Sequence, residues 1–274
     1  MRGFIDLHTH GLGPFDTRIN NPELILKMVA LHREHGTSLI LPTIYPADIK
    51  TMRENMEAIR AAMKQDASIK GINLEGPFLN PARCGALDKD ALLKPSLSIL
   101  KALLRGFEDE VKIITIAPEL PGALKIIEYC AGLGIRVNMG HSDATFQEAY
   151  NGKKAGATGI THFFNAMRPI HHREPGIAGF GLLDEDIYVE VIADGIHVSP
   201  EMLKLVFKMK RPDRILLVSD SVKGKMGKPV FKRGVLQGGG FPLSGCESIL
   251  KGIGISEALI RKAGRENQMK FLSL

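Results

Sequence analysis

The sequence has no tryptophan, only four tyrosines and only three cysteines in 274 residues. Cys84, Cys130 and Cys246 are an odd number at wide spacing, and none of them belongs to a Cys-x-x-Cys pair. This pattern excludes a disulfide framework and a cysteine zinc knuckle, and it is typical of a protein whose thiols stay reduced. The few aromatic residues and the lack of a basic-aromatic recognition motif also argue against a nucleic-acid partner.

Long hydrophobic runs are missing as well. Asp6 lies where a signal peptide needs apolar residues, and no later stretch reaches the ~18 uncharged apolar residues of a membrane helix. We therefore expect a cytoplasmic protein with no membrane partner. The formal net charge of +6 leaves room for an anionic small molecule, which charge alone does not identify.

The sequence does contain a regular alternation of short β-branched runs and longer stretches with helical spacing. This alternation predicts a parallel sheet with helices on its outside. Eight such runs suggest a closed (β/α)8 barrel of the TIM type, whose usual size is about 250 residues, so we expect a single α/β domain over residues 1–274. The expected strands are Phe4–His8, Ser38–Pro42, Ile69–Leu74, Val111–Ile116, Arg136–Met139, Gly159–His162, Tyr188–Ile192 and Arg214–Val218.

The stretch from Ser221 to Gly245 interrupts the alternation. It mixes basic residues with a run of three glycines at 238–240, and we interpret it as a long loop after the eighth strand. Two functions are open for such a loop. It is either a solvated basic segment or a lid that draws an anionic substrate to the mouth of the barrel.

Polar side chains follow the expected strands at their ends. The first strand ends in His8-Thr9-His10, and because side chains alternate along a strand, both histidines can face one metal ion. This pair alone is weak support, since capping and surface histidines are common. Polar residues at the ends of five more strands make a metal site the better interpretation: Glu75, His141, His162, His197 and Asp220.

Imidazole and carboxylate ligands without cysteine suit zinc, iron, cobalt or manganese, with zinc as the first choice. Such a divalent ion lowers the pKa of a bound water to about 7 and polarises a carbonyl, which makes hydrolysis the natural reaction. Asp220 follows the apolar run of the eighth strand. We assign it as general base toward the attacking water and general acid toward the leaving amine, with a helix N-cap or a plain metal ligand as its alternatives.

Longer motifs in the same order resemble a known family, the N-acetylglucosamine-6-phosphate deacetylases of the amidohydrolase superfamily. The resemblance spans most of the chain. It is carried by the segments 3–11 (GFIDLHTHG), 74–81 (LEGPFLNP), 117–119 (APE), 140–145 (GHSDAT), 161–167 (THFFNAM), 173–176 (REPG), 193–197 (ADGIH) and 217–220 (LVSD).

The resemblance implies a metal-dependent hydrolase that deacetylates N-acetylglucosamine 6-phosphate to glucosamine 6-phosphate and acetate. It implies that Glu75, His141 and His162 hold the principal metal, and that His8 and His10 belong to a second position that some members have lost. One or two ions per subunit are therefore expected. A homodimer is also implied, because a phosphate contact can come from the neighbouring subunit. The residues expected at the phosphorylated amino sugar are Asn165, Ala166, Ala86, Leu243 and the phosphate pair Arg173 and His197.

The sequence departs from the family pattern in three places. The accessory β-sandwich of the family is expected to be missing or vestigial, Leu87 replaces a histidine that often contacts the sugar, and Ser221 begins a changed loop. Two alternatives therefore stay open. One is an amidohydrolase acting on another N-acyl sugar, a cyclic amide or a purine, although Ala117-Pro118-Glu119 lacks the lysine that cyclic amidases often carry there. The other is a non-catalytic barrel that binds a sugar phosphate.

Overall fold

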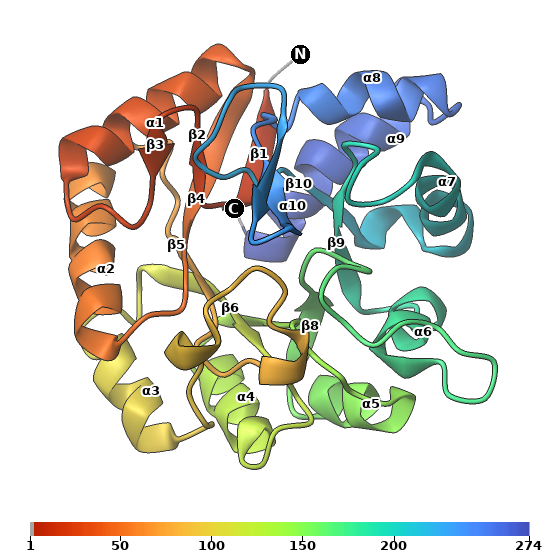
Figure 1. Ribbon diagram of the computed structural model, residues 1–274, viewed down its shortest axis with the longest axis horizontal. Coiled ribbons are helices and arrows are strands. Elements are labelled where there is room, and N and C mark those ends of the chain that lie inside the picture. The colour runs from red at the N-terminus through yellow and green to blue at the C-terminus, as the bar shows by residue number, and fades with distance from the viewer. Residues whose placement is uncertain (1–2, 274) are drawn as a thin grey trace.

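The computed structural model describes residues 3–273, and these form a barrel of eight parallel strands (Figure 1). The strands follow one another around the sheet in chain order. All eight expected strands are present, which confirms the predicted (β/α)8 barrel. They are β1 (Phe4–Thr9), β4 (Thr37–Ile44), β5 (Ile72–Glu75), β6 (Val111–Ile116), β7 (Arg136–Met139), β8 (Ala157–Ile160), β9 (Tyr188–Ile192) and β10 (Ile215–Val218).

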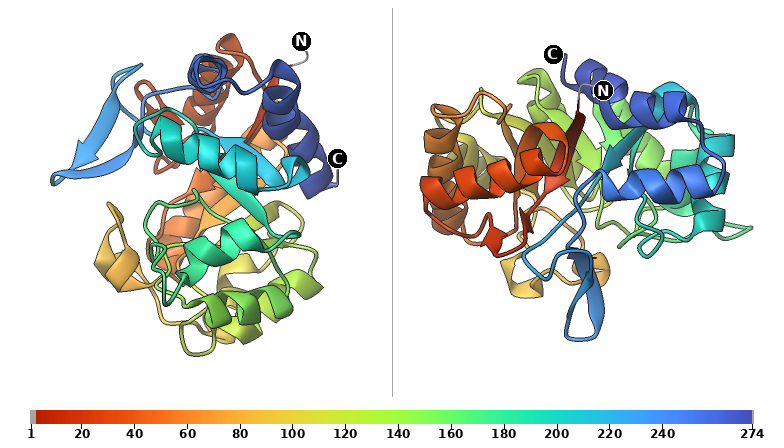
Figure 2. Two further views of the ribbon diagram at one scale, coloured as in Figure 1. Left: turned by 90° about the vertical axis from the view of Figure 1, so that its right-hand side faces the viewer. Right: turned by 90° about the horizontal axis from the view of Figure 1, so that it is seen from above.

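Helices follow each strand and cover the outside of the barrel (Figures 1 and 2). Asn21 caps α1 ahead of Pro22, and Ser199 caps α7 ahead of Pro200, because both side chains accept main-chain N–H groups of the first turn. No described helix is long and apolar enough to cross a membrane. The helices are α1 (Pro22–Glu34), α2 (Ile49–Met63), α3 (Leu97–Leu104), α4 (Ala123–Gly132), α5 (Phe146–Lys154), α6 (Gly176–Leu183), α7 (Pro200–Met209), α8 (Gly245–Gly252), α9 (Glu257–Arg261) and α10 (Asn267–Leu272), with short helical turns at Pro81–Arg83, Lys89–Ala91, Pro212–Arg214 and Lys262–Glu266.

Buried apolar side chains form two clusters, one between the sheet and its helices and a smaller one inside the barrel. Phe271 of α10 closes the floor of the barrel. Its ring packs on Tyr188 at the start of β9, with the centroids 5.0 Å apart, and its carbonyl accepts from Arg136 at the start of β7. Buried polar residues lie toward the opposite end of the barrel, in the strands or directly after them: Asn73, Thr115, Asn138, Thr161 and Glu190.

The barrel closes between β1 and β10 at its carboxyl-terminal end. Thr9 and Ser221 form a parallel bridge, and their hydroxyl oxygens lie 2.8 Å apart. The amide of Asp220 donates to the carbonyl of His8 at 2.9 Å, and the amide of His10 donates to the carbonyl of Ser221 at 2.8 Å. The contacts that close the barrel therefore also fix the main chain of three predicted site residues.

The expected long loop after the eighth strand is wrong, because this segment contains a β-hairpin. β11 (Pro229–Lys232) pairs with β12 (Val235–Gly239) across a turn at Arg233 and Gly234. Both turn residues have positive φ, +52° and +79°, as in the two-residue turns that match the twist of paired strands. Figure 2 shows the hairpin projecting from the barrel. The lysines and glycines around it obscured the strand pattern, and arginine is an unusual first turn residue.

The described residues, 3–273, contain no β-sandwich beside the barrel. The strands outside the barrel belong to the hairpin and to a small pair, β2 (Gly11–Leu12) with β3 (Phe15–Asp16). This pair follows β1 directly and leads into α1.

Replacing Phe271 by alanine should lower the free energy of unfolding by about 3–5 kcal/mol, because the lost ring leaves a cavity in the barrel floor. Urea unfolding followed by circular dichroism measures the change. Phe231, 61% exposed on the hairpin, is the matched control, and Phe231→Ala should stay within ~0.5 kcal/mol of the wild type. Equal losses in the two variants would contradict the role of Phe271 as the barrel floor.

Candidate active site

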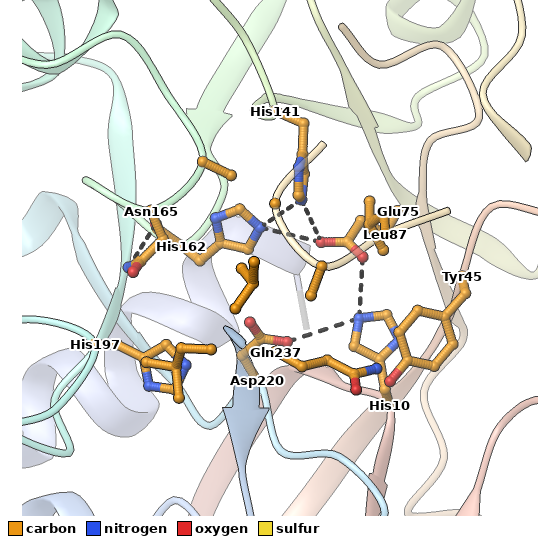
Figure 3. A pocket seen from close by; sticks show the side chains of 15 residues that line it. His10, Tyr45, Glu75, Leu87, His141, His162, Asn165, His197, Asp220 and Gln237 are labelled. Atoms are coloured by element: carbon orange, nitrogen blue, oxygen red, sulfur yellow. Dashed lines mark hydrogen bonds and ion pairs between the residues drawn. The ribbon is translucent and has the colours of Figure 1, made fainter. Parts of the chain in front are cut away.

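A cleft opens at the carboxyl-terminal ends of the barrel strands, where most of the predicted site residues meet (Figure 3). Its cavity volume is about 240 Å³. His8 lies beneath its surface and is fully buried. The predicted residues that line the cleft are His10, Glu75, Ala86, His141, His162, Asn165, Ala166, His197 and Asp220.

Glu75, at the end of β5, is the centre of the cluster. Its Oε1 lies 3.0 Å from Nε2 of His141 and 3.0 Å from Nε2 of His162. These two imidazole nitrogens are themselves 3.0 Å apart. The three side chains, which come from the ends of three different strands, therefore offer three ligand atoms to one small volume.

A second group shares the same carboxylate. The other oxygen of Glu75, Oε2, lies 3.2 Å from Nε2 of His10, whose own neighbour is Nε2 of His8 at 3.3 Å. His8 and His10 thus face the same side of β1, as the alternation predicted, while Thr9 between them contacts His32 of α1. Glu75 is the member common to both groups.

The hydrogen-bond partner of Nδ1 determines which tautomer His141 and His10 adopt. Nδ1 of His141 faces the carbonyl of Arg83 at 2.8 Å, and Nδ1 of His10 faces the carbonyl of Thr43 at 3.1 Å. Carbonyl oxygens only accept, so both Nδ1 atoms carry the proton, and a neutral ring then directs the Nε2 lone pair at Glu75. Lone pairs and a carboxylate facing one another at about 3 Å repel, unless a cation lies between them. The donor set therefore fits a metal ion.

The negatively charged side chains around His8 also favour a cation in this cluster. Burial alone would lower the pKa of His8, but the nearby carboxylates of Asp220, Glu190 and Glu75 outweigh burial and raise it to about 10. For Glu75, burial alone would raise the pKa, but when His141 and His10 carry the positive charge that a metal ion would otherwise supply, their charge and hydrogen bonds hold that pKa well below its ordinary range. The cluster thus keeps its carboxylate ionised and favours positive charge beside it.

Unusual backbone conformations hold several of these side chains. His141, His162 and Asp220 follow their strands at φ values of +45°, +28° and +43°, and Phe164 and Ala166 also have positive φ. Residues with a side chain rarely adopt these angles, and such strain concentrates at functional sites. The sharp turns let each side chain point back into the cleft just where its strand ends.

Asp220 faces the cluster from the opposite wall of the cleft. Its Oδ1 lies 3.6 Å from Nε2 of His8 and 3.7 Å from Nε2 of His10, and Figure 3 shows its carboxylate directed at the space between the imidazoles. At these distances it makes no hydrogen bond to either ring. A carboxylate placed beside the cluster and open to the cleft can exchange protons with a molecule bound there.

His197 forms a second polar element of the cleft wall, with Asp194. Its Nδ1 lies 2.7 Å from Oδ2 of Asp194, whose Oδ1 accepts the amide of His197 at 2.9 Å. Burial alone would lower the pKa of His197, but the hydrogen bond and charge of Asp194 raise it. Nε2 of this ring is buried without a hydrogen-bond partner among the described residues. A charged imidazole N–H at this position suits an anionic group of a ligand.

Two predicted substrate contacts, Leu243 and the phosphate ligand Arg173, lie away from the cleft. Leu243 is fully buried in the outer core, where an apolar side chain gains most from burial, and it does not line the cleft. Arg173 is exposed on the loop before α6 and lies outside the cleft walls of its own chain. The direction in which each of these two loops turns depends on packing and does not follow from the local sequence.

Sequence reasoning also missed residues that line the cleft. Tyr45 follows β4 directly and stacks on His10, with ring centroids 3.7 Å apart, and its buried hydroxyl has no partner among the described residues. Its position at the end of the second strand was a usable signal. Gln237 reaches the cleft from β12, so it could not be found while the hairpin was interpreted as a loop. Leu87, noted as a departure from the family pattern, lines the cleft as well.

Comparison with known sequences identifies the family. The profile of the Amidohydrolase family matches residues 1–229. An N-acetylglucosamine-6-phosphate deacetylase from Lysinibacillus sphaericus is 32% identical over 235 residues, which are 82% of this chain and 59% of that protein. An N-acetylgalactosamine-6-phosphate deacetylase from Escherichia coli O157:H7 is 32% identical over 223 residues, 80% of this chain and 59% of that protein. The chain thus spans about three-fifths of the length of these relatives.

Solved structures agree with the sequence relatives. The N-acetyl-D-glucosamine-6-phosphate deacetylase of Mycobacterium smegmatis, in complex with N-acetyl-D-glucosamine-6-phosphate, superimposes with a TM-score of 0.93 at 28% identity, over 100% of this chain and 77% of that one. The Thermotoga maritima N-acetylglucosamine-6-phosphate deacetylase gives a TM-score of 0.90 at 31% identity, over 100% of this chain and 78% of that one. The chain belongs to the N-acetylglucosamine-6-phosphate deacetylase family of the amidohydrolases.

Proposed function

We propose that this protein hydrolyses the acetamide of N-acetylglucosamine 6-phosphate to glucosamine 6-phosphate and acetate. The observation that carries the proposal is the convergence of Glu75 and four histidines beside Asp220 in one cleft. Relatives that are named for this reaction support the choice of substrate, as does the sugar phosphate bound in the Mycobacterium smegmatis structure.

The donor set supports a divalent metal as cofactor. Glu75, His141 and His162 would hold one ion, and Glu75 with His8 and His10 would hold a second. We propose zinc, since imidazole and carboxylate ligands suit it, while iron, cobalt and manganese accept the same ligands. A bound ion of this kind would lower the pKa of a water ligand to about 7 and polarise the acetyl carbonyl.

Asp220 carries the proton transfers in this proposal. Its carboxylate takes a proton from the attacking water as the new C–O bond forms. It then returns that proton to the amine nitrogen as the C–N bond breaks, so that the amino sugar leaves as a neutral amine; the acetic acid formed keeps the new oxygen and the second water proton, which it releases to solvent to become acetate. The position of Asp220 in the cleft wall, beside the cluster but without a hydrogen bond to an imidazole, supports this role.

Replacing Asp220 by asparagine should lower kcat for acetate release by roughly 10²–10⁴-fold, the usual contribution of a general acid-base group. The amide keeps the shape of the side chain but cannot carry the proton. Acetate release from N-acetylglucosamine 6-phosphate measures the loss, and elemental analysis of the same sample should find the metal content of the wild type. Full activity in Asp220→Asn would contradict the mechanism.

The phosphate group has a binding partner in His197. The ring is oriented by Asp194, and its raised pKa keeps it protonated to higher pH than an ordinary histidine. Its unpaired Nε2 can then donate a charge-assisted hydrogen bond to phosphate. As the pH rises through that pKa the charge is lost, so the KM for a phosphorylated substrate should increase with pH.

Replacing His197 by asparagine should raise the KM for the sugar phosphate by roughly 10–100-fold, which corresponds to the loss of a charged hydrogen bond. It should also remove most of the rise in KM with pH, while kcat changes little. Unphosphorylated N-acetylglucosamine is the control substrate, and its kcat/KM should hardly change. An equal loss on both substrates would show that His197 does not bind the phosphate.

Arg173 supports a homodimer. The side chain is exposed outside the cleft of its own chain, as expected for an arginine that reaches the cleft of a neighbouring subunit. Arginine suits phosphate because its planar guanidinium can donate two parallel hydrogen bonds. We propose that Arg173 and His197 of the two subunits of a cytoplasmic homodimer bind one phosphate together.

Mixing Asp220→Asn chains with Arg173→Ala chains tests this arrangement. If Arg173 binds phosphate in the cleft of the other subunit, every mixed dimer contains one complete cleft. Equimolar subunit exchange makes about half of the dimers mixed, so it should restore roughly a quarter of the wild-type rate. Each variant alone should stay impaired on dilute sugar phosphate. The absence of recovery after confirmed exchange, or a monomer in sedimentation, would contradict the proposal.

A second substrate in the same class is N-acetylgalactosamine 6-phosphate. One relative of similar identity is named for that sugar, and Leu87 gives the cleft an apolar wall where the family often has a histidine. The ratio of kcat/KM for the two sugar phosphates decides between them. A barrel that binds either one tightly without releasing acetate under any of the four metals would instead be a binding protein.

A further inference from the structure

Glu190 is a buried acid that the proposed reaction does not use. It lies in the middle of β9, is 0% exposed and points into the polar half of the barrel. A buried carboxylate is costly unless its oxygens are fully hydrogen-bonded or paired with positive charge. No lysine or arginine among the described residues forms an ion pair with Glu190. Its partners are instead residues at the site, His8 among them.

Every polar contact of the Glu190 side chain is with a donor. Oε2 lies 3.1 Å from Nδ1 of His8 and 3.4 Å from the amide of His162. Oε1 accepts from the side-chain amide of Asn138 at 2.7 Å. When a metal ion takes the place of the second proton of His8, this contact keeps the remaining proton on Nδ1, and the lone pair lies on Nε2, which faces Glu75 at 3.7 Å.

The contact with Asn138 depends on a glycine. Asn138 lies on β7, Glu190 on β9, and Gly159 occupies the intervening strand β8 in register with Asn138. A Cβ atom at Gly159 would lie 2.2 Å from Oδ1 of Asn138. Only a residue without a side chain leaves room for Asn138 to reach across to Glu190. Three strands are therefore shaped around this one carboxylate.

Among the four histidines around Glu75, His8 is the one whose Nδ1 faces a carboxylate. The corresponding nitrogens of His10 and His141 face main-chain carbonyls. A carboxylate on the far side of a ligating imidazole fixes its tautomer and makes its other nitrogen a stronger donor to a metal. The fully buried ring of His8 thus has its orientation and its donor strength set by Glu190.

We propose that Glu190, supported by Asn138 across Gly159, is a positioning residue that makes the His8, His10 and Glu75 group a metal position. The inference rests on the metal-dependent function proposed above and deepens it. Glu190 touches no substrate in this assignment and acts through His8. The Glu75, His141 and His162 group depends on it less, because its sole link to Glu190 is the longer contact with the amide of His162.

Metal binding of the intact 274-residue chain tests the proposal directly. Wild-type protein titrated with zinc against a chromophoric chelator should take up two equivalents per chain. Glu190→Gln should bind the second equivalent roughly 10–100-fold more weakly, as other outer partners of metal ligands do, and the first with little change. Cobalt-substituted protein gives an independent readout, because the visible absorption of the second cobalt should be lost at matched concentration.

Asp6→Asn is the matched control. Asp6 is also a buried carboxylate of the barrel interior, 0% exposed, but it accepts main-chain amides of His8 and Ser219 and touches no imidazole nitrogen. This variant should keep both zinc equivalents. If Glu190→Gln fails to fold, Asn138→Ala, which removes the donor that holds Glu190, should show the same selective weakening of the second equivalent.

Three results would overturn the proposal: wild-type affinities for both equivalents in Glu190→Gln or Asn138→Ala, equal weakening in Asp6→Asn, or a wild-type protein that takes up one equivalent only. The deacetylase proposal fails separately. A wild-type chain that binds two metals but releases no acetate would contradict the reaction, while the effect of Glu190 on metal binding would stand.

Discussion

A carboxylate buried among four imidazoles needs positive charge close to it, and the organisation of this barrel follows from that need. Glu75 is 3% exposed, and its two oxygens face the Nε2 atoms of His141, His162 and His10 at 3.0–3.2 Å. His141 and His10 each place Nδ1 against a main-chain carbonyl, so the lone pair of a neutral ring lies on Nε2 and points at Glu75. The arrangement is stable when a cation occupies its centre, which is why we interpret it as a metal site and not as a packed polar core.

The rest of the fold holds this cluster in place. Phe271 closes the floor of the barrel, and the apolar interior above it extends to Leu7 and Val218, directly before the polar residues of the site. The first and last strands meet at their carboxyl-terminal ends, and the hydrogen bonds that join them fix His8, His10 and Asp220 together. Stability and the proposed function are therefore linked where the barrel closes, because a change in how β10 meets β1 moves Asp220, the proposed general base, relative to the proposed metal ligands His8 and His10.

The sequence predicted the barrel and the centre of its site for physical reasons that are local. Buried parallel strands are short β-branched runs, and the ends of such strands gather at one face, so His141 and His162 could be placed together without knowing any distance. His8 and His10 share a side of β1 because of simple alternation.

Features that depend on how loops turn or on contacts across the barrel could not be predicted in this way. Leu243 and Arg173 occupy loops whose direction is set by packing, and the hairpin turn at Arg233 and Gly234 lacks the usual residues. Glu190 looked like one more residue of a strand. Its role depends on the hydrogen bond from Asn138, which reaches Glu190 over Gly159. This contact spans three neighbouring strands, and the local sequence of any one of them does not indicate it.

Anomalous X-ray diffraction from crystals grown with zinc, recorded on both sides of the zinc absorption edge, tests the central claim most directly. The account predicts one anomalous peak between Glu75, His141 and His162, and a second between Glu75, His8 and His10. A zinc-containing crystal without an anomalous peak beside Glu75 would contradict it.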